Sequence, residues 1–214
     1  MLILALSTSS STASVAIYNS DTDTVIEKIC TGGKTHSETL MPTVSELFEE
    51  TAIEPAQIDM IAVDVGPGSF TGVRIGVATG NAMAMALNKQ MAAVSSLEAL
   101  AFSKYSQSTA VLLDARNGNG YAAHYTQGIE TMPPSAVVID EFISTLPDST
   151  LFLGDGATIH KEIITAKISD AKFDDAHISA ANVAKHAFLH KDIICVQVLP
   201  LYLKPSQAER LHGK

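Results

Sequence analysis

The sequence has few charged residues, few aromatic residues and almost no cysteine. Only 17% of its 214 residues are charged and 46% are hydrophobic, whereas disordered chains combine low hydrophobicity with high charge. We therefore expect a folded chain, with one large domain or two of about a hundred residues each. The two cysteines, Cys30 and Cys195, lie far apart in the sequence, so neither a disulfide framework nor a zinc finger is expected.

Basic residues are also scarce. The chain has 14 lysines and arginines against 23 aspartates and glutamates, which gives a formal net charge of -9. A polyanion is repelled by such a chain at long range, so the protein alone is predicted to bind nucleic acid poorly. The basic residues near the C-terminus, such as Arg210 and Lys214, either touch a phosphate in a larger assembly or are simply solvated.

Long apolar runs are missing as well. No run approaches the roughly 20 apolar residues of a membrane span. The first residues, Met1–Leu6, contain no positive charge and are followed by the polar Ser7, which is unlike a signal peptide. We expect a soluble, cytoplasmic protein that makes no membrane contact.

Apolar runs, turn residues and helical periodicity predict the same order of elements twice. The first half should contain strands and helices at Met1–Leu6, Ala13–Tyr18, Thr24–Cys30, Thr35–Thr51, Ile58–Val65, Ser69–Leu87, Met91–Val94 and Ser96–Tyr105, with a turn at Gly32-Gly33. The second half should contain them at Thr109–Asp114, Tyr121–Thr126, Ala136–Ile139, Glu141–Thr145, Thr150–Leu153, Ala157–Lys167 and Ser179–His190. The repeated β-β-β-α-β-α order predicts a duplicated α/β fold with lobes at residues 1–105 and 106–214.

One glycine-rich segment, Asp64–Gly76, leaves a predicted buried strand and opens a predicted helix. Its backbone N–H groups favour an anion site, although it lacks the Gly-Lys-Ser/Thr ending of a Walker A loop and the Gly-x-Gly-x-x-Gly pattern. The alternative is a tight turn with close packing.

Three aspartates, Asp64, Asp114 and Asp155, fall near the ends of predicted strands. Carboxylates there either hold a metal–nucleotide complex or serve as ordinary turn and cap residues. His186 and His190 have the spacing of a helical metal pair but no third ligand, so we expect them on an exposed helix face.

Two helices of the first half have more apolar surface than one face needs. Small residues recur every four positions in the second of them, at Gly72, Gly76, Gly80 and Ala84. Because each interior glycine costs roughly 0.5–1 kcal/mol, another backbone should pack against this stripe, from the protein's own sheet or from a partner helix. In the helix Thr35–Thr51, where Thr35 and Glu38 form a capping box, a wide apolar arc serves a core and a second surface, or is simply buried.

Several segments together resemble the TsaB (YeaZ) family. They are Thr8-Ser9, His36-Ser37-Glu38, Leu40-Met41-Pro42, Gly66-Pro67-Gly68-Ser69-Phe70-Thr71-Gly72-Val73-Arg74-Ile75-Gly76, Val94–Ala101, Leu113-Asp114-Ala115-Arg116, Gly154-Asp155-Gly156-Ala157 and Pro200-Leu201-Tyr202-Leu203-Lys204. The resemblance implies the ASKHA fold, the two-lobed architecture of actin, hexokinase and Hsp70, and allows the C-terminal segment to return to the first lobe.

The resemblance also implies a function. It indicates a non-catalytic subunit, without a cofactor, that works with the catalytic TsaD and the ATPase TsaE. Together they attach a threonylcarbamoyl group to adenosine 37 of tRNAs that read codons beginning with A. Family members form homodimers through helices of the first lobe, and tRNA is met only through the complex.

Two positions depart from the family pattern. Many relatives have Asp-Thr-Ser at the first turn, where this chain has Ser7-Thr8-Ser9, and Glu-Val-Tyr where it has Asn119-Gly120-Tyr121. In nucleotide-using ASKHA proteins the first aspartate helps to organise the metal, so its replacement argues against ATP hydrolysis. The alternative function is an ASKHA-type ATPase or small-molecule kinase that uses Asp64, Asp114 and the Gly154-Asp155-Gly156 loop.

The predicted sites follow from these patterns and from the resemblance. No catalytic or metal-binding residue is expected. The predicted partner or homodimer interface consists of Leu40, Met41, Val44, Leu47, Phe48, Gly72, Val73, Gly76, Val77, Gly80 and Ala84. The predicted weak nucleotide or anion contacts are Gly68, Ser69, Thr71, Arg74 and Asp114.

Overall fold

The structure, a computed structural model, describes residues 1–31, 35–190 and 193–204. The predicted turn at Gly32-Gly33 and the basic residues Arg210 and Lys214 lie outside this range. The chain forms two compact units. The first unit consists of Met1–Ser103 and His177–Pro200, and the second of Lys104–Ala176 together with, among the described residues, 201–204.

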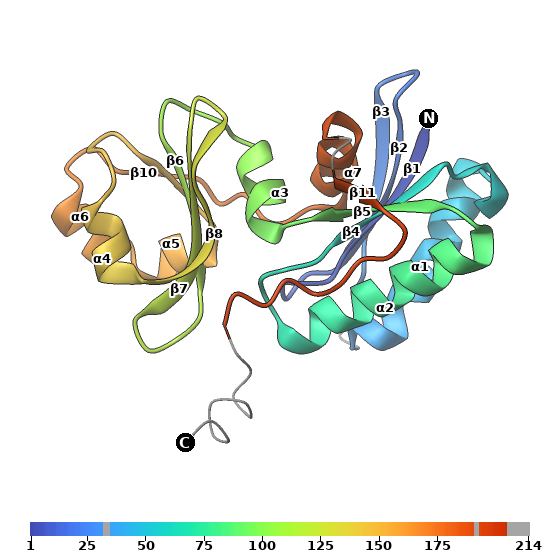
Figure 1. Ribbon diagram of the computed structural model, residues 1–214, viewed down its shortest axis with the longest axis horizontal. Coiled ribbons are helices and arrows are strands. Elements are labelled where there is room, and N and C mark those ends of the chain that lie inside the picture. The colour runs from blue at the N-terminus through green and yellow to red at the C-terminus, as the bar shows by residue number, and fades with distance from the viewer. Residues whose placement is uncertain (32–34, 191–192, 205–214) are drawn as a thin grey trace. The chain divides into compact units, whose positions relative to one another are not determined.

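The first unit is built on a six-stranded sheet with the strand order β11-β5-β4-β1-β2-β3. The strands are β1 (Leu2–Ser7), β2 (Ser14–Asn19), β3 (Thr24–Ile29), β4 (Met60–Asp64), β5 (Gln90–Val94) and β11 (Ile194–Cys195). The central strands β1, β4 and β5 are parallel, while β2, β3 and β11 pair antiparallel. The central strands read as continuous apolar runs because helices cover both faces of the sheet (Figure 1).

Helices α1 (His36–Thr51) and α2 (Phe70–Leu87) cover one face of this sheet, and α3 (Ser96–Phe102) and α7 (Ala180–Leu189) cover the other (Figure 1). A short 3-10 helix, Pro55–Gln57, precedes β4. The core between the sheet and helices α3 and α7 consists mainly of small and β-branched residues: Ile3, Ala5, Ala16, Ala62, Ala92, Val94, Ala99, Val183, Ala184 and Ala187.

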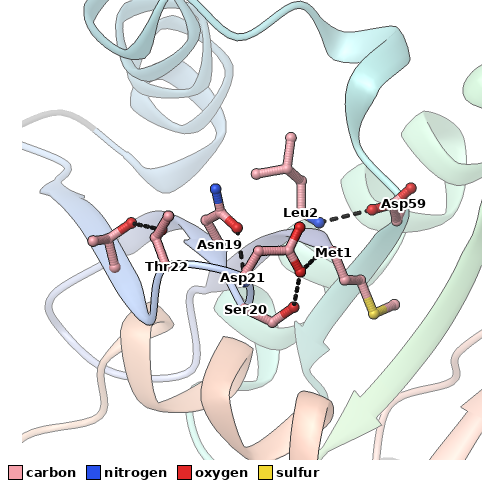
Figure 2. Close-up of polar contacts among 8 residues, drawn as sticks. Met1, Leu2, Asn19, Ser20, Asp21, Thr22 and Asp59 are labelled. Carbon is pink, nitrogen blue, oxygen red and sulfur yellow. Dashed lines mark hydrogen bonds and ion pairs between the residues drawn. The ribbon is translucent and has the colours of Figure 1, made fainter.

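Polar contacts hold the first residues of β1 in place. The Leu2 N–H donates to the Asp59 carboxylate at 2.8 Å, and the N-terminal ammonium group of Met1 lies 2.9 Å from the Asp21 carboxylate (Figure 2). The ion pair is exposed and contributes little to stability. The Asp59 bond, together with the return bond from the Asp59 N–H to the Leu2 carbonyl, sets the register of β1 and β4.

The second unit contains a five-stranded sheet with the order β10-β9-β6-β7-β8. Its strands are β6 (Thr109–Asp114), β7 (Asn119–Thr126), β8 (Ile129–Val138), β9 (Leu151–Leu153) and β10 (Lys172–Phe173). Its helices are α4 (Ile139–Ser144), α5 (Asp155–Ile159) and α6 (Lys161–Lys167). They pack on the sheet around Phe142, Phe152 and Ile164.

The predicted order β-β-β-α-β-α is present in both units, and the capping box of Thr35 and Glu38 opens α1 as expected. Several details differ. Strand β8 already begins at Ile129 and runs through Pro133 and Pro134, which an edge strand tolerates because its outer N–H groups need no partner. The helix predicted at Ala157–Lys167 is divided at His160 into α5 and α6. The C-terminal segment returns to the first unit, as the resemblance allowed: α7 packs on that unit's sheet and β11 pairs with β5.

Candidate functional site

The β1–β2 turn, residues 8–13, meets the glycine loop, residues 65–69, at one end of the first sheet. Because β1 and β4 are parallel neighbours with Leu6 opposite Val63, the residues that follow them, Ser7 and Asp64, lie side by side. The glycine loop belongs to the segment Asp64–Gly76, for which the sequence left two alternatives open, an anion site and a tight turn. Its geometry shows what the glycine-rich segment does.

Asp64 is fully buried at the centre of this region. One carboxylate oxygen, Oδ2, accepts hydrogen bonds from the hydroxyls of Ser7, at 2.8 Å, and Ser9. The other oxygen, Oδ1, accepts from the Ser96 hydroxyl at 2.5 Å and from the Gly66 N–H at 3.0 Å. Burial raises the pKa of Asp64, while these four hydrogen bonds oppose the rise.

The glycine stripe of α2 faces the protein's own sheet. A Cβ at Gly72 would overlap the Thr8 carbonyl oxygen, one at Gly76 the Thr8 hydroxyl, and one at Gly80 the Val63 side chain. The glycines therefore let α2 approach the β1–β2 turn and strand β4 more closely than any other residue would allow. Of the two explanations considered for this stripe, close packing on the protein's own sheet is the one that the structure shows.

The expected interface residues divide into a buried and an exposed group. Nine of the eleven are core residues of the first unit: Leu40, Val44, Leu47, Gly72, Val73, Gly76, Val77, Gly80 and Ala84. This corrects the expectation, because side chains that the sheet already covers present no surface to a partner. Met41 is 48% exposed and Phe48 is half-buried, so these two remain on the outer side of α1.

Sequence reasoning missed other residues on the outer faces of these helices. Phe70 is 45% exposed and Met85 is 83% exposed, both on α2. The Arg74 guanidinium stacks 3.7 Å above the Phe70 ring, which is a favourable cation–π geometry. Helical periodicity could have predicted their exposure, since these positions lie off the glycine stripe.

Four of the expected anion contacts lie in the glycine loop and α2 of the first unit, and the fifth lies in the second unit. The Ser69 N–H donates to the Ser9 carbonyl at 2.6 Å, and the Ser69 hydroxyl accepts from the Gly72 N–H at 3.2 Å. Gly68, Thr71 and Arg74 are exposed residues of the same loop and helix. Asp114 belongs to the second unit. The Ser69 N–H group therefore fits the tight-turn alternative, because it donates to a carbonyl of the protein's own backbone.

Asp114 has its own partners at the end of β6. Its carboxylate lies 2.9 Å from His160 Nε2 and accepts from the Arg116 N–H at 3.2 Å. Its N–H donates to the Asp155 carboxylate at 3.1 Å. Asp114 thus closes a local turn with Arg116, and Asp155 joins the first residue of α5 to the end of β6. Among residues 1–31, 35–190 and 193–204 no group of three or more histidine, cysteine, aspartate or glutamate side chains is arranged to hold a metal ion.

The histidine pair of α7 differs from expectation. The His186 and His190 rings stack with their centres 4.2 Å apart, but His186 is buried, with its ring edge-on to Phe102. The exposed helix face expected for this pair is therefore wrong for His186, because its side of α7 packs into the first unit.

A buried polar cluster surrounds His124 in the second unit. His124 Nε2 lies 2.8 Å from the Ser108 hydroxyl and Nδ1 lies 2.6 Å from the Thr131 hydroxyl, while Ser108 also contacts the Thr150 hydroxyl at 2.8 Å. Burial lowers the pKa of His124, because removing the ring from water disfavours its cation. The folded protein therefore keeps this imidazole neutral.

We expect the second unit to lose stability as the pH falls below about 6.5, the usual pKa of an unfolded histidine. Below that pH the unfolded chain binds a proton at His124 that the folded chain does not, and the loss is at most about 1.4 kcal/mol per pH unit. Urea unfolding between pH 5 and 7.5 measures it. His124→Gln should flatten the slope and His177→Gln, at an exposed histidine, should leave it unchanged; equal slopes in all three proteins would contradict the prediction.

Comparison with known proteins first identifies the class of fold. A proposed N-acetylmannosamine kinase from Listeria monocytogenes aligns over 90% of this chain and 100% of its own, with a TM-score of 0.52 and 10% identity. That likeness concerns the fold alone. Together with the repeated β-β-β-α-β-α units it confirms the ASKHA fold.

The family follows from closer relatives. The family model described as "TsaD: tRNA N6-adenosine threonylcarbamoyltransferase" matches residues 30–199. The tRNA threonylcarbamoyladenosine biosynthesis protein TsaB of Bacillus subtilis is 32% identical over 98% of this chain and 96% of its own length. The structure of YeaZ from Pseudomonas aeruginosa aligns with a TM-score of 0.78 and 28% identity, over 94% of this chain and 99% of that one. The chain belongs to the TsaB (YeaZ) family.

No helix among the described residues has both the length and the apolar character needed to cross a membrane.

Proposed function

We propose that this chain is the non-catalytic partner subunit of the machinery that attaches threonylcarbamoyl to adenosine 37 of tRNA, working with TsaD and TsaE. The relationship to a protein named for tRNA threonylcarbamoyladenosine biosynthesis spans nearly the whole of both chains. The family model carries the name of the transferase itself, which supports a subunit that shares the transferase's architecture.

The state of the β1–β2 turn is the observation that carries the non-catalytic part of the proposal. A carboxylate that organises a metal–phosphate complex needs oxygens that are free to accept the metal or its water shell. Both oxygens of Asp64 are instead engaged by Ser7, Ser9, Ser96 and the Gly66 N–H, beneath a turn that α2 covers. This arrangement stabilises the protein itself and favours a scaffold over a phosphate-transferring enzyme.

The partner surface is proposed on the outer faces of α1 and α2. Met41, Phe70 and Met85 are large apolar side chains exposed there, and Phe48 on α1 is half-buried. Aromatic residues, methionine and arginine are typical of protein interfaces. This face pairs with TsaD in the complex and with a second copy when the chain is alone. With its net charge of -9, the chain meets tRNA only through its partners.

Reconstitution tests the proposal. The purified chain should neither modify tRNA nor hydrolyse ATP in the presence of magnesium. Leaving it out of a mixture of TsaD, TsaE, ATP, threonylcarbamoyl adenylate and tRNA should abolish threonylcarbamoyl transfer. Both reactions are followed with labelled substrates.

The competing function, an ATPase or small-molecule kinase, predicts the opposite. Magnesium-dependent ATP turnover by the pure chain that Asp114→Asn removes, and that Asp175→Asn at an exposed carboxylate leaves intact, would establish an enzyme and exclude the scaffold.

A further inference from the structure

The β1–β2 turn is bound to three helices of the first unit. Towards α2, the Ser9 carbonyl accepts from the Ser69 N–H at 2.6 Å and the Thr8 hydroxyl donates to the Gly72 carbonyl at 2.7 Å. Towards α1, His36 Nε2 lies 2.9 Å from the Ser10 carbonyl. Because a carbonyl only accepts, this nitrogen carries the proton.

Towards α3, the same turn is reached through a hydroxyl pair. The Ser96 hydroxyl lies in the first turn of α3, 3.0 Å from the Ser9 hydroxyl, and both hydroxyls donate to the Asp64 carboxylate. The N-terminal ends of α1, α2 and α3 are thus all fastened to residues 8–10. A displacement of this short turn would therefore move the starting ends of three helices.

A buried carboxylate, that of Asp64, also binds this turn. Asp64 ends β4, a central strand of the sheet, and is 0% exposed. It binds Ser9 in the turn, Ser7 at the end of β1 and Ser96 in α3. Hydrogen bonds to a charged group are stronger than neutral ones, and in this dry position each donor that loses Asp64 is left without its acceptor.

We infer that Asp64 is a positioning residue for the partner surface: through the β1–β2 turn it sets the starting ends of α1 and α2, the helices that carry Met41 and Phe70. This inference rests on the proposed function for the identity of the partner. The geometric part, that Asp64 controls the order of these helix ends, concerns the isolated chain alone.

Two alanine variants within the same turn separate this role from general stability. Ser9→Ala removes the hydroxyl that joins the turn to Asp64 and Ser96 but leaves the carbonyl that accepts from Ser69. Ser10→Ala is the matched control, since the Ser10 hydroxyl bonds to the Thr12 carbonyl within the turn and does not reach Asp64. Amide hydrogen exchange is measured by NMR at Ser69 and Val73 in α2 and, as a reference, at His190, whose N–H bonds within α7.

In Ser9→Ala, exchange at Ser69 and Val73 should accelerate roughly tenfold or more, the effect of losing one hydrogen bond to a charged group. Exchange at His190 should not change, and Ser10→Ala should resemble the unaltered protein at all three amides. Affinity for TsaD, measured by titration calorimetry, should fall in Ser9→Ala and not in Ser10→Ala. Asp64→Asn keeps one oxygen acceptor but replaces the other with an NH2 group that cannot accept a hydrogen bond, so it should also accelerate exchange at Ser69 and Val73.

Any one of several results would overturn the inference. They are equal exchange in the two alanine variants, acceleration that extends to His190 in Ser9→Ala, and faster exchange at Ser69 with unchanged TsaD affinity. Unchanged protection at Ser69 and Val73 in Asp64→Asn would also contradict a role of Asp64 as the hydrogen-bond acceptor of the turn. If the unaltered chain does not bind TsaD at all, the proposed function fails, while the exchange experiment still decides whether Asp64 orders the helix ends.

Discussion

Glutamate in place of Leu47 is expected to unfold the first unit. Leu47 is 0% exposed on the inner face of α1, so the substitution removes about 2 kcal/mol of apolar burial. It also buries a carboxylate that has no partner, at a further cost of several kcal/mol. Together these losses approach the 5–15 kcal/mol of stability typical of a whole domain. Circular dichroism during heating should show no cooperative transition for this unit, or one at a greatly lowered temperature.

Met41→Glu is the matched control on the same helix. Met41 is 48% exposed, so a glutamate there remains solvated and the melting temperature should change little. The charge would nevertheless lie in the surface proposed for TsaD, and pairing should weaken at least about tenfold because an unpaired charge at the centre of an interface is poorly tolerated. A folded Leu47→Glu protein that has lost only its pairing would instead place Leu47 in the interface and contradict the buried position described here.

Alanine in place of Gly72 is expected to destabilise the first unit, although alanine normally stabilises a helix relative to glycine by roughly 0.5–1 kcal/mol. The added Cβ would overlap the Thr8 carbonyl oxygen and would lie 3.2 Å from the Ser69 side chain. Since the obstacle is backbone, relief requires moving α2 away from the β1–β2 turn. Overpacking of this kind costs about 1–3 kcal/mol or more, which lowers the melting temperature by about 5–10 °C.

Ala82→Gly is the control on the same helix, and it introduces a glycine where Gly72→Ala removes one. Ala82 is exposed on α2, so the substitution should lower stability by only about 0.5–1 kcal/mol, the intrinsic helix preference. A Gly72→Ala protein that is as stable as the unaltered chain, or more stable, would mean that the close approach of α2 to Thr8 is absent in solution.

Local sequence was sufficient to predict most elements of both units. Strands and helices followed from periodicity and caps: Thr35 with Glu38 opens α1, and Ser69 caps α2 by accepting from the Gly72 N–H. The Gly-Pro-Gly-Ser-Phe-Thr-Gly segment, taken with the other motifs, was specific enough to indicate the family. Such signals are local, because a capping residue and its helix are only a few positions apart.

Tertiary structure alone decided which side of each helix is the surface. A stripe of glycines at every fourth position indicates that another element packs closely against α2, but the same pattern fits packing on a sheet or on a partner helix. The structure shows that the stripe packs on the protein's own sheet, because added Cβ atoms would overlap Thr8 and Val63. The proposed interface therefore moves from Val73 and Val77 to exposed residues such as Phe70.

The cluster around Asp64 shows why the rest could not be predicted. Ser7, Ser9, Asp64 and Ser96 are spread over some ninety positions and come together only because β1 and β4 are parallel neighbours and α3 begins beside their ends. An aspartate after a strand has the same sequence signal whether it holds a metal, caps a turn or anchors one. The burial of its oxygens and the donors that reach them distinguish these roles, and both are determined by segments distant in sequence.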